Sequence, residues 1–179
     1  MFKPSVIKST VGYHGFFDVR VDTLSLEGKA PMDYSVVLNA RHAVVILAIT
    51  LKGDFILSRE YRHPTSDYIL GLPGGTVDPG EDFLVAAQRE LKEETGYIAP
   101  IWEPLLTTYP FPAISHQKIH YYLAKEASFQ EAPQKEPYEL IDILLLNQEK
   151  LLSLLSSGEP LDGVLFPPLF WALFNRPLA

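Results

Sequence analysis

The 179-residue sequence predicts a mixed α/β or α+β domain, because strand-like and helix-like segments follow one another along the chain. The run HAVVILAIT (residues 42–50) is continuous and β-branched, which is typical of a strand buried on both faces. The segment from Glu81 to Thr95 instead repeats its apolar residues with a helical period. Since strands precede and separate the helices, and tight turns join some strands, both belong to one mixed architecture.

The first half of the chain is expected to consist mainly of strands. Residues 16–27 alternate in places between apolar and polar and lead through a turn into DYSVVL (33–38), which predicts an antiparallel hairpin. FILSREYR (55–62) predicts a further strand. Residues 64–81 are rich in glycine and proline, so we expect a loop there.

The second half begins with the predicted helix from Glu81 to Thr95, which Gly96 ends as a left-handed cap. Residues 105–126 predict a proline-broken loop and then a strand, and residues 138–146 predict another strand. Two more helices are expected. One covers NQEKLLSLLSS and ends at Gly158, and a short terminal one follows the proline pair in VLFPPLFWALF.

The composition excludes several classes of protein. The net charge is −7, and the few Lys and Arg are scattered, so the chain lacks the basic stripe of a nucleic-acid-binding protein. It has no cysteine, which excludes disulfides, thiolate-bound zinc and a cysteine nucleophile. The longest apolar run, Ala43–Ile49, is too short to cross a bilayer, and the N-terminus is no signal peptide. We therefore expect a cytoplasmic protein with no nucleic-acid or membrane partner.

Three glutamates, Glu90, Glu93 and Glu94, gather near the C-terminal end of the predicted helix, where the helix dipole disfavours negative charge. Like charges three or four residues apart also repel, by roughly 0.2–0.5 kcal/mol per pair. On a helical wheel Glu90 and Glu94 lie beside the apolar stripe, whereas Arg89 and Lys92 lie on the other side. Such carboxylates need a compensating cation, and Mg²⁺ or Mn²⁺ prefers oxygen ligands. The pattern predicts a metal site.

Glu81 is expected in the first turn of the helix, where negative charge is favoured, and to pair with Arg89 in a supporting role. The preceding loop, GLPGGTVDPGE (71–81), contains four glycines, which allow the backbone to approach a metal ion or a phosphate. It is not a Walker loop, because no Lys-Ser or Lys-Thr pair follows.

Loop and helix together resemble the signature of Nudix hydrolases. Five residues separate Gly75 from Glu81, and seven more precede RELKEETGY (89–97). Of the positions that the signature defines, only Tyr97 departs, where an aliphatic residue is usual.

The likeness extends beyond this signature to the ADP-ribose pyrophosphatase branch of the family. Four further features are similar to that branch: ILSREYRHP, Pro112 sixteen residues beyond Gly96, YELIDI, and the closing SGEPLDGVLFPPLFWAL.

The resemblance implies a Nudix fold, with a mixed β-sheet sandwiched between helices and a small N-terminal antiparallel β-hairpin or sheet. Residues 1–39 would form a β subdomain for dimerisation and for a wall of the substrate site, and residues 40–179 the hydrolase domain. The implied activity is metal-dependent hydrolysis of the diphosphate bond of a nucleoside diphosphate linked to a sugar. ADP-ribose is the expected substrate, and the enzyme is expected to be a homodimer. GDP-mannose, flavin dinucleotide and dinucleoside polyphosphates are alternative substrates. A ligand sensor on the same fold is a remote alternative.

The resemblance also implies roles for single residues. The metal ligands would be Glu90, Glu94 and the carbonyl of Gly74, with Glu93 assisting. Either Glu139 or Glu136 would act as base, and Arg89 would orient the carboxylates through Glu81. The substrate-binding residues would be Arg62 for phosphate, Phe17 and Tyr34 for adenine, and Pro112 for the terminal ribose.

Two of these residues have a second interpretation, and three further positions differ from the branch. Packing within the hairpin is an equally good interpretation of Phe17 and Tyr34. Three positions depart from the branch and affect the choice of substrate: Gly71 in place of a glutamate, Asn39 near a basic position, and Gln117 in place of a glutamate.

Overall fold

The computed structural model describes residues 3–38, 41–134 and 140–175. Its contacts divide the chain into two compact units. The first unit falls within residues 1–41 and 109–118, and the second within residues 42–108 and 119–179. Each unit has its own β-sheet. None of the described helices is long and apolar enough to span a membrane.

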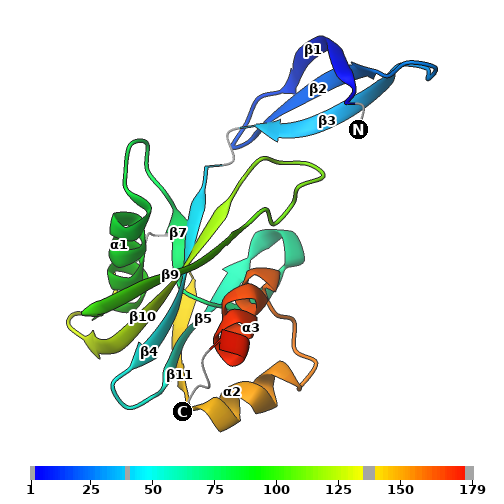
Figure 1. The fold of residues 1–179 in the computed structure, drawn as a ribbon. Helices are drawn as coiled ribbons and strands as arrows, with labels where there is room; N and C mark the ends of the chain where they lie inside the picture. The colour runs from blue at the N-terminus through cyan, green and yellow to red at the C-terminus, as the bar shows by residue number, and fades with distance from the viewer. Residues whose placement is uncertain (1–2, 39–40, 135–139, 176–179) are drawn as a thin grey trace. The chain divides into compact units, whose positions relative to one another are not determined.

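The first unit is a three-stranded antiparallel sheet (Figure 1, blue). Its strands are β1 (Ser5–Tyr13), β2 (Asp18–Ser25) and β3 (Met32–Leu38), in that order. The predicted hairpin is confirmed as β2 and β3, whereas β1 was not predicted. Every residue of β1 is exposed, so this strand carries no burial pattern that the sequence could reveal. The loop at residues 109–118 joins this unit, because the N–H of Val37 donates to the carbonyl of Ile114 at 2.8 Å.

The second unit contains an eight-stranded mixed sheet. Its central path is β11-β5-β4-β10-β8, with β6 beside β5, β7 beside β4 and β9 beside β10. Strands β4 and β10 run parallel, and the other pairs are antiparallel. The bounds are β4 Ala43–Thr50, β5 Phe55–Arg62, β6 Asp67–Gly71, β7 Gly74–Thr76, β8 Tyr97–Ile98, β9 Ile101–Thr108, β10 Ile119–Phe129 and β11 Ile141–Leu146.

Helices cover both faces of this sheet (Figure 1). Side chains of β4 alternate between the two faces, as the period of a strand requires. Val44, Ile46 and Ala48 pack with the helix α1 (Phe83–Thr95) on one face. On the other face, a second core includes residues of α2 (Gln148–Leu155) and α3 (Phe166–Asn175). The predicted mixed sheet between helices is confirmed, as is the small antiparallel N-terminal sheet.

The helix α1 begins two residues later than predicted. Asp82 is its N-cap, in extended conformation, and its carboxylate accepts the N–H groups of Leu84 and Val85. Glu81 therefore precedes the helix and does not lie in its first turn, which corrects the sequence prediction. Gly96 ends the helix with φ of 74°, as predicted for a left-handed cap.

Two other predictions need correction. The predicted loop at residues 64–81 contains the short strands β6 and β7, because this chain segment completes hydrogen bonding to β5 and β4. The terminal helix α3 starts at Phe166, so its two prolines lie in the first turn and not before the helix. Proline is tolerated there, since N–H groups of the first turn have no partner within the helix.

Candidate active site

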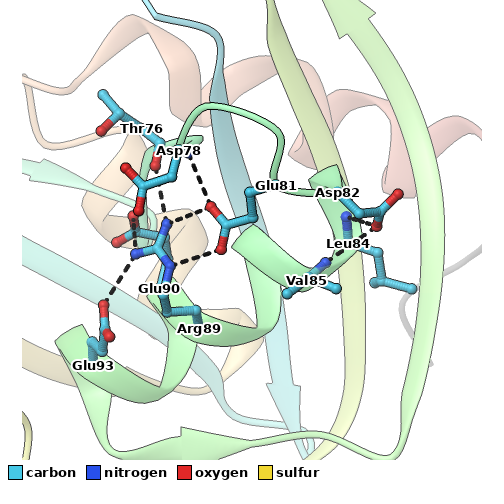
Figure 2. Close-up of polar contacts among 9 residues, drawn as sticks. All are labelled: Thr76, Asp78, Glu81, Asp82, Leu84, Val85, Arg89, Glu90 and Glu93. Carbon is cyan, nitrogen blue, oxygen red and sulfur yellow. Dashed lines mark hydrogen bonds and ion pairs between the residues drawn. The ribbon is translucent and has the colours of Figure 1, made fainter.

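Arg89 of α1 is the centre of a cluster of carboxylates in the second unit (Figure 2). Its Nε and Nη2 donate to the two carboxylate oxygens of Glu81 at 2.9 and 3.0 Å. Its Nη1 donates to Glu90 at 2.8 Å and to Glu93 at 3.1 Å. A further bond runs from Nη2 to the carbonyl of Thr76, at 3.1 Å. One guanidinium thus fixes three carboxylates and the strand that precedes the helix.

The bond between Arg89 and Glu81 shifts the ionisation of both groups. Hydrogen bonds from Arg89 and from the backbone N–H of Asp78 lower the pKa of Glu81 to about 2. Hydrogen bonds to Glu81 and Glu90 raise the pKa of Arg89 above its ordinary value. Both side chains are therefore charged over the whole neutral range, and the planar fork of arginine suits this two-bond geometry.

The position of Arg89 corrects one step of the sequence argument. The helical wheel placed Arg89 on the side away from Glu90, yet its guanidinium contacts both Glu90 and Glu93. A wheel gives the direction of the Cα–Cβ bond, whereas the long arginine side chain carries its charge to a neighbouring face. The protein itself thus supplies part of the positive charge that compensates the glutamates.

The strand β7 brings glycines against the same carboxylates. The N–H of Gly74 donates to Glu94 at 2.9 Å, which ties the strand to the last turn of α1. A Cβ atom at Gly75 would lie 2.5 Å from the carboxylate atoms of Glu90, so only glycine leaves room for that carboxylate. The backbone therefore approaches Glu90 and Glu94 closely. The predicted approach of this backbone to a metal ion or a phosphate stays a prediction.

These residues offer the donor atoms that a hard divalent cation prefers. Glu90 and Glu94 lie one helical turn apart, and Gly74 is bound to Glu94. Four carboxylates, those of Glu81, Glu90, Glu93 and Glu94, share this neighbourhood with one guanidinium. In the described part of the chain, no group of three or more His, Asp or Glu side chains lies in a geometry that could hold a metal ion, and three of these carboxylates are bonded to Arg89. The oxygen chemistry nonetheless fits Mg²⁺ or Mn²⁺.

Arg62 ends the strand β5 in the second unit, and its side chain is 48% exposed. Its Nη1 donates to the carboxylate of Glu60 at 2.7 Å. The charge of Arg62 is therefore held at the surface by a neighbour two residues away on the same face of the strand.

The residues predicted to hold the nucleoside and the terminal sugar lie in the first unit. Tyr34 of β3 donates its hydroxyl hydrogen to the carbonyl of Ala113, so the structure brings Tyr34 beside the loop that contains Pro112. Phe17 is 46% exposed and makes an edge contact with Phe16, with ring centroids 4.8 Å apart. Tyr34 is 37% exposed and also keeps this contact inside the unit, so stacking on adenine stays a prediction for both rings.

Other predicted positions have different outcomes. Glu136, Glu139 and Asn39 lie outside the described residues. Gln117 donates its side-chain amide to the carbonyl of Arg41 at 2.8 Å. Sequence reasoning missed the carbonyl of Thr76 and the N–H of Asp78, and as backbone groups they leave no signal in residue identity.

Comparison with known proteins places this geometry in context. The model of the NUDIX domain family matches residues 39–164. The chain is 32% identical to the ADP-ribose pyrophosphatase of Bacillus subtilis (strain 168), over 68% of this chain and 66% of that protein, just under two thirds of its length. It is 31% identical to the methanol dehydrogenase activator of Bacillus methanolicus, over 91% and 89% of the two chains. A crystal structure of an ADP compounds hydrolase shares the fold with a TM-score of 0.89 and 26% identity, and covers 100% of this chain and 98% of that one.

Proposed function

Because this chain belongs to the Nudix family, we propose that it hydrolyses the diphosphate bond of a nucleoside diphosphate linked to a sugar. ADP-ribose is the preferred substrate, with AMP and ribose 5-phosphate as products. The observation that carries this proposal is the cluster of Glu81, Glu90 and Glu93 on Arg89, with Gly74 bound to Glu94. The relatives named ADP-ribose pyrophosphatase and ADP compounds hydrolase support the substrate class.

Glu90 and Glu94 would hold the divalent cation, assisted by Glu93 and the carbonyl of Gly74. When bound, Mg²⁺ or Mn²⁺ neutralises the diphosphate and lowers the pKa of a water molecule. Arg89 keeps Glu90 and Glu93 in place, and the pair of Arg89 with Glu81 anchors Arg89 itself. This network preorganises the carboxylates before the substrate arrives.

The remaining roles concern the substrate and the water. Arg62 would bind the anionic phosphate oxygens, for which a guanidinium fork is suited. Glu139, or Glu136 as its alternative, would accept the proton of the attacking water. The water oxygen forms a bond to phosphorus, and the bridging P–O bond breaks to leave two phosphate monoesters. Phe17 and Tyr34 would stack on the purine, and Pro112 would shape the wall around the terminal ribose.

We further propose a cytoplasmic homodimer in which residues 1–39 act as the dimerisation and substrate-wall subdomain. The first unit exposes several large apolar side chains that a partner would cover. Four of these side chains are 55–60% exposed: Val6, Ile7, Tyr13 and Met32. Light scattering at micromolar protein concentration should give twice the chain mass of 20.1 kDa. A species of 20.1 kDa at that concentration would contradict the dimer.

Steady-state kinetics test the substrate assignment. We expect kcat/KM to be highest for ADP-ribose among ADP-ribose, GDP-mannose, NADH, flavin dinucleotide and diadenosine polyphosphates. A competitor that exceeds ADP-ribose tenfold, about 1.4 kcal/mol of transition-state preference, overturns the choice of ADP-ribose but not the Nudix chemistry. Absence of metal-dependent hydrolysis of every compound overturns the enzymatic function.

A further inference from the structure

The last turn of α1 carries two of the glutamates that would bind the metal, and its backbone needs hydrogen-bond donors. Carbonyls in the last turn of a helix have no partner within that helix. The carbonyl of Lys92 accepts the N–H of Gly96 at 2.8 Å, which is the local bond of a left-handed cap. A continued helix would bring the N–H of Tyr97 to the carbonyl of Glu93. That N–H donates instead to the hydroxyl of Thr95, at 3.1 Å, so Glu93 needs a donor from another segment.

This donor comes from the segment that follows β10. The N–H of Gln134 donates to the carbonyl of Glu93 at 2.8 Å. Two further N–H groups of the same segment donate to the carbonyl of Gly96, at 2.9 and 3.4 Å. We call residues 130–134 the helix clamp, because their backbone holds two carbonyls at the end of α1.

The helix clamp lies very close to the end of α1. A Cβ atom at Gly96 would lie 1.9 Å from the carbonyl oxygen of Glu131, so this approach requires glycine. Just before the clamp, β10 pairs with β8, where the rings of Phe129 and Tyr97 lie 5.5 Å apart. The ion pair of Glu131 with Lys92 is exposed and contributes little to stability. The backbone thus makes the main contact.

The bond of Gln134 acts on the peptide group between Glu93 and Glu94, since the carbonyl of Glu93 belongs to that peptide group. The carboxylate of Glu93 is bonded to Arg89 at 3.1 Å, and that of Glu94 accepts the N–H of Gly74 at 2.9 Å. The backbone sets the direction of each Cα–Cβ bond. A shift of this one peptide group therefore moves both carboxylates.

We propose that the N–H of Gln134 is a positioning group of the metal site, an inference that rests on the proposed function. It fixes the peptide group between Glu93 and Glu94, and so holds their carboxylates at a fixed spacing for the divalent cation. Groups behind the ligands affect metal affinity in this way, because they orient the ligands. Gln134 itself touches neither the metal nor the substrate in this role, and it takes no part in breaking the P–O bond.

Two substitutions at one position test the N–H directly. Gln134→Pro removes the N–H, whereas Gln134→Ala keeps it and removes only an exposed side chain. Titration calorimetry without substrate measures the dissociation constant for Mn²⁺. We expect it to rise about tenfold in Gln134→Pro and to stay within about twofold in Gln134→Ala.

A third variant controls for the rigid ring of proline. A backbone ester at residue 134, made with the α-hydroxy acid of glutamine, lacks the N–H but leaves φ free. It should weaken Mn²⁺ binding as much as Gln134→Pro does. The thermal midpoint of the metal-free protein should fall by only about 2–6 °C in both, the loss of one neutral hydrogen bond.

The dependence of activity on metal separates positioning from general damage. Hydrolysis of ADP-ribose by Gln134→Pro should fall at low Mg²⁺ and return to within about threefold of the wild type at saturating Mg²⁺, since excess metal offsets a weaker site. A protein that is simply less well folded would lose activity at every Mg²⁺ concentration.

The outcomes also separate this inference from the proposed function. Weaker Mn²⁺ binding in the proline and ester variants, with Gln134→Ala unchanged, supports the inference. Wild-type Mn²⁺ affinity in the ester variant overturns it, and so does an equal loss in Gln134→Ala. If the wild type binds Mn²⁺ but hydrolyses no nucleoside diphosphate compound, the proposed function fails while the metal-site role of Gln134 is still decided by the titrations.

Discussion

The Arg89 cluster (Glu81, Arg89, Glu90 and Glu93) and the Gly71 site (Ser58, Gly71 and Asp162) are both polar, but their polar groups are bonded differently. In the Arg89 cluster, a single guanidinium bonds to Glu81, Glu90 and Glu93, and every bond is charge-assisted. In the Gly71 site the bonds involve the backbone: Asp162 accepts the N–H of Val164 at 3.1 Å and donates its own N–H to the carbonyl of Leu70 at 2.8 Å. The first joins side chains of one segment to each other, whereas the second joins a returning loop to the edge of a strand.

The two groups of residues also differ in how the chain assembles them. The Arg89 cluster and its tie to β7 come from one continuous segment, residues 74–94, so its geometry follows from a strand, a turn and a helix. The Gly71 site is assembled from three separate segments, and its residues can change without disturbing that helix. In the proposed function preorganised charge serves the reaction, so we expect the Arg89 cluster to tolerate substitution less well than the residues around Gly71.

The largest effect should follow from Glu94→Gln. The amide oxygen of glutamine can still accept the N–H of Gly74, so the fold should persist. Activity on ADP-ribose in Mg²⁺ should fall at least about 100-fold, because a ligand of the cation loses its charge. Removal of the metal with a chelator should abolish the activity of the wild type. Thermal stability should be unchanged or higher, since a repelling carboxylate leaves the C-terminal end of the helix.

The matched control for that variant is Glu131→Gln. Glu131 pairs with Lys92 at 3.0 Å, and both side chains are more than 40% exposed. This change should alter neither activity nor stability measurably, because exposed ion pairs contribute about 0–1 kcal/mol. Turnover of Glu94→Gln near the wild-type value, in a folded protein, would contradict the role of Glu94 in metal binding.

Arg89→Lys tests whether the carboxylates need the planar guanidinium of arginine or only a positive charge. Lysine keeps the charge but cannot donate in parallel to both oxygens of Glu81 while it reaches Glu90 and Glu93. We expect kcat to fall about tenfold and the thermal midpoint to decrease, since the carboxylates lose their common anchor. Lys92→Gln, on the same helix, is the control and should change stability by at most about 1 kcal/mol. Equal behaviour of the two variants would show that Arg89 does not organise the cluster.

Two glycines give a more direct comparison of the sites. Gly75→Ala places Cβ 2.5 Å from the carboxylate of Glu90, whereas Gly71→Ala meets its nearest atom, Asp162 Cβ, at 3.5 Å. Glu90 ends a flexible side chain and can move aside, so stability should fall by only about 1 kcal/mol in Gly75→Ala. Its activity should fall about tenfold, since Glu90 leaves its position. Gly71→Ala should cost less than about 1 kcal/mol of stability. Thermal unfolding measures the stability of both variants, and kcat measures their activity. A larger loss in Gly71→Ala than in Gly75→Ala would contradict the close packing at Gly75.

The sequence predicted the helix of the Arg89 cluster well because the relevant signals are local. The apolar period, Gly96 as cap, and the spacing of eight residues between Glu81 and Arg89 all act within one segment. The reach of Arg89 to Glu90 and Glu93 was not predicted, because it depends on the rotamers of long side chains. The strand β1 was not predicted either, since it is exposed throughout and forms only by pairing with β2.

The Gly71 site could not be predicted from local patterns. Ser58 and Asp162 are more than 100 positions apart in the sequence. They become neighbours because Leu161 forms a bridge to Leu70 at the edge of β6. That contact is a consequence of tertiary packing, in which loops return to the edge of a sheet without a sequence signal of their own. The roles of Arg62, Phe17, Tyr34 and Pro112 remain predictions.

The smallest effect is confined to acid solution and concerns Glu81. Its pKa is about 2 in the folded protein, against an ordinary value of 4.5, because Arg89 and the N–H of Asp78 bond to the carboxylate. Between these values the unfolded chain binds a proton that the folded chain does not, so the free energy of unfolding rises with pH. The contribution of Glu81 is therefore fully present above about pH 4.5 and is lost as the pH falls toward 2. Urea unfolding between pH 7 and 2.5 should show a shallower decline for Glu81→Gln than for the wild type. Parallel declines would mean that Arg89 does not hold Glu81 ionised in the folded protein.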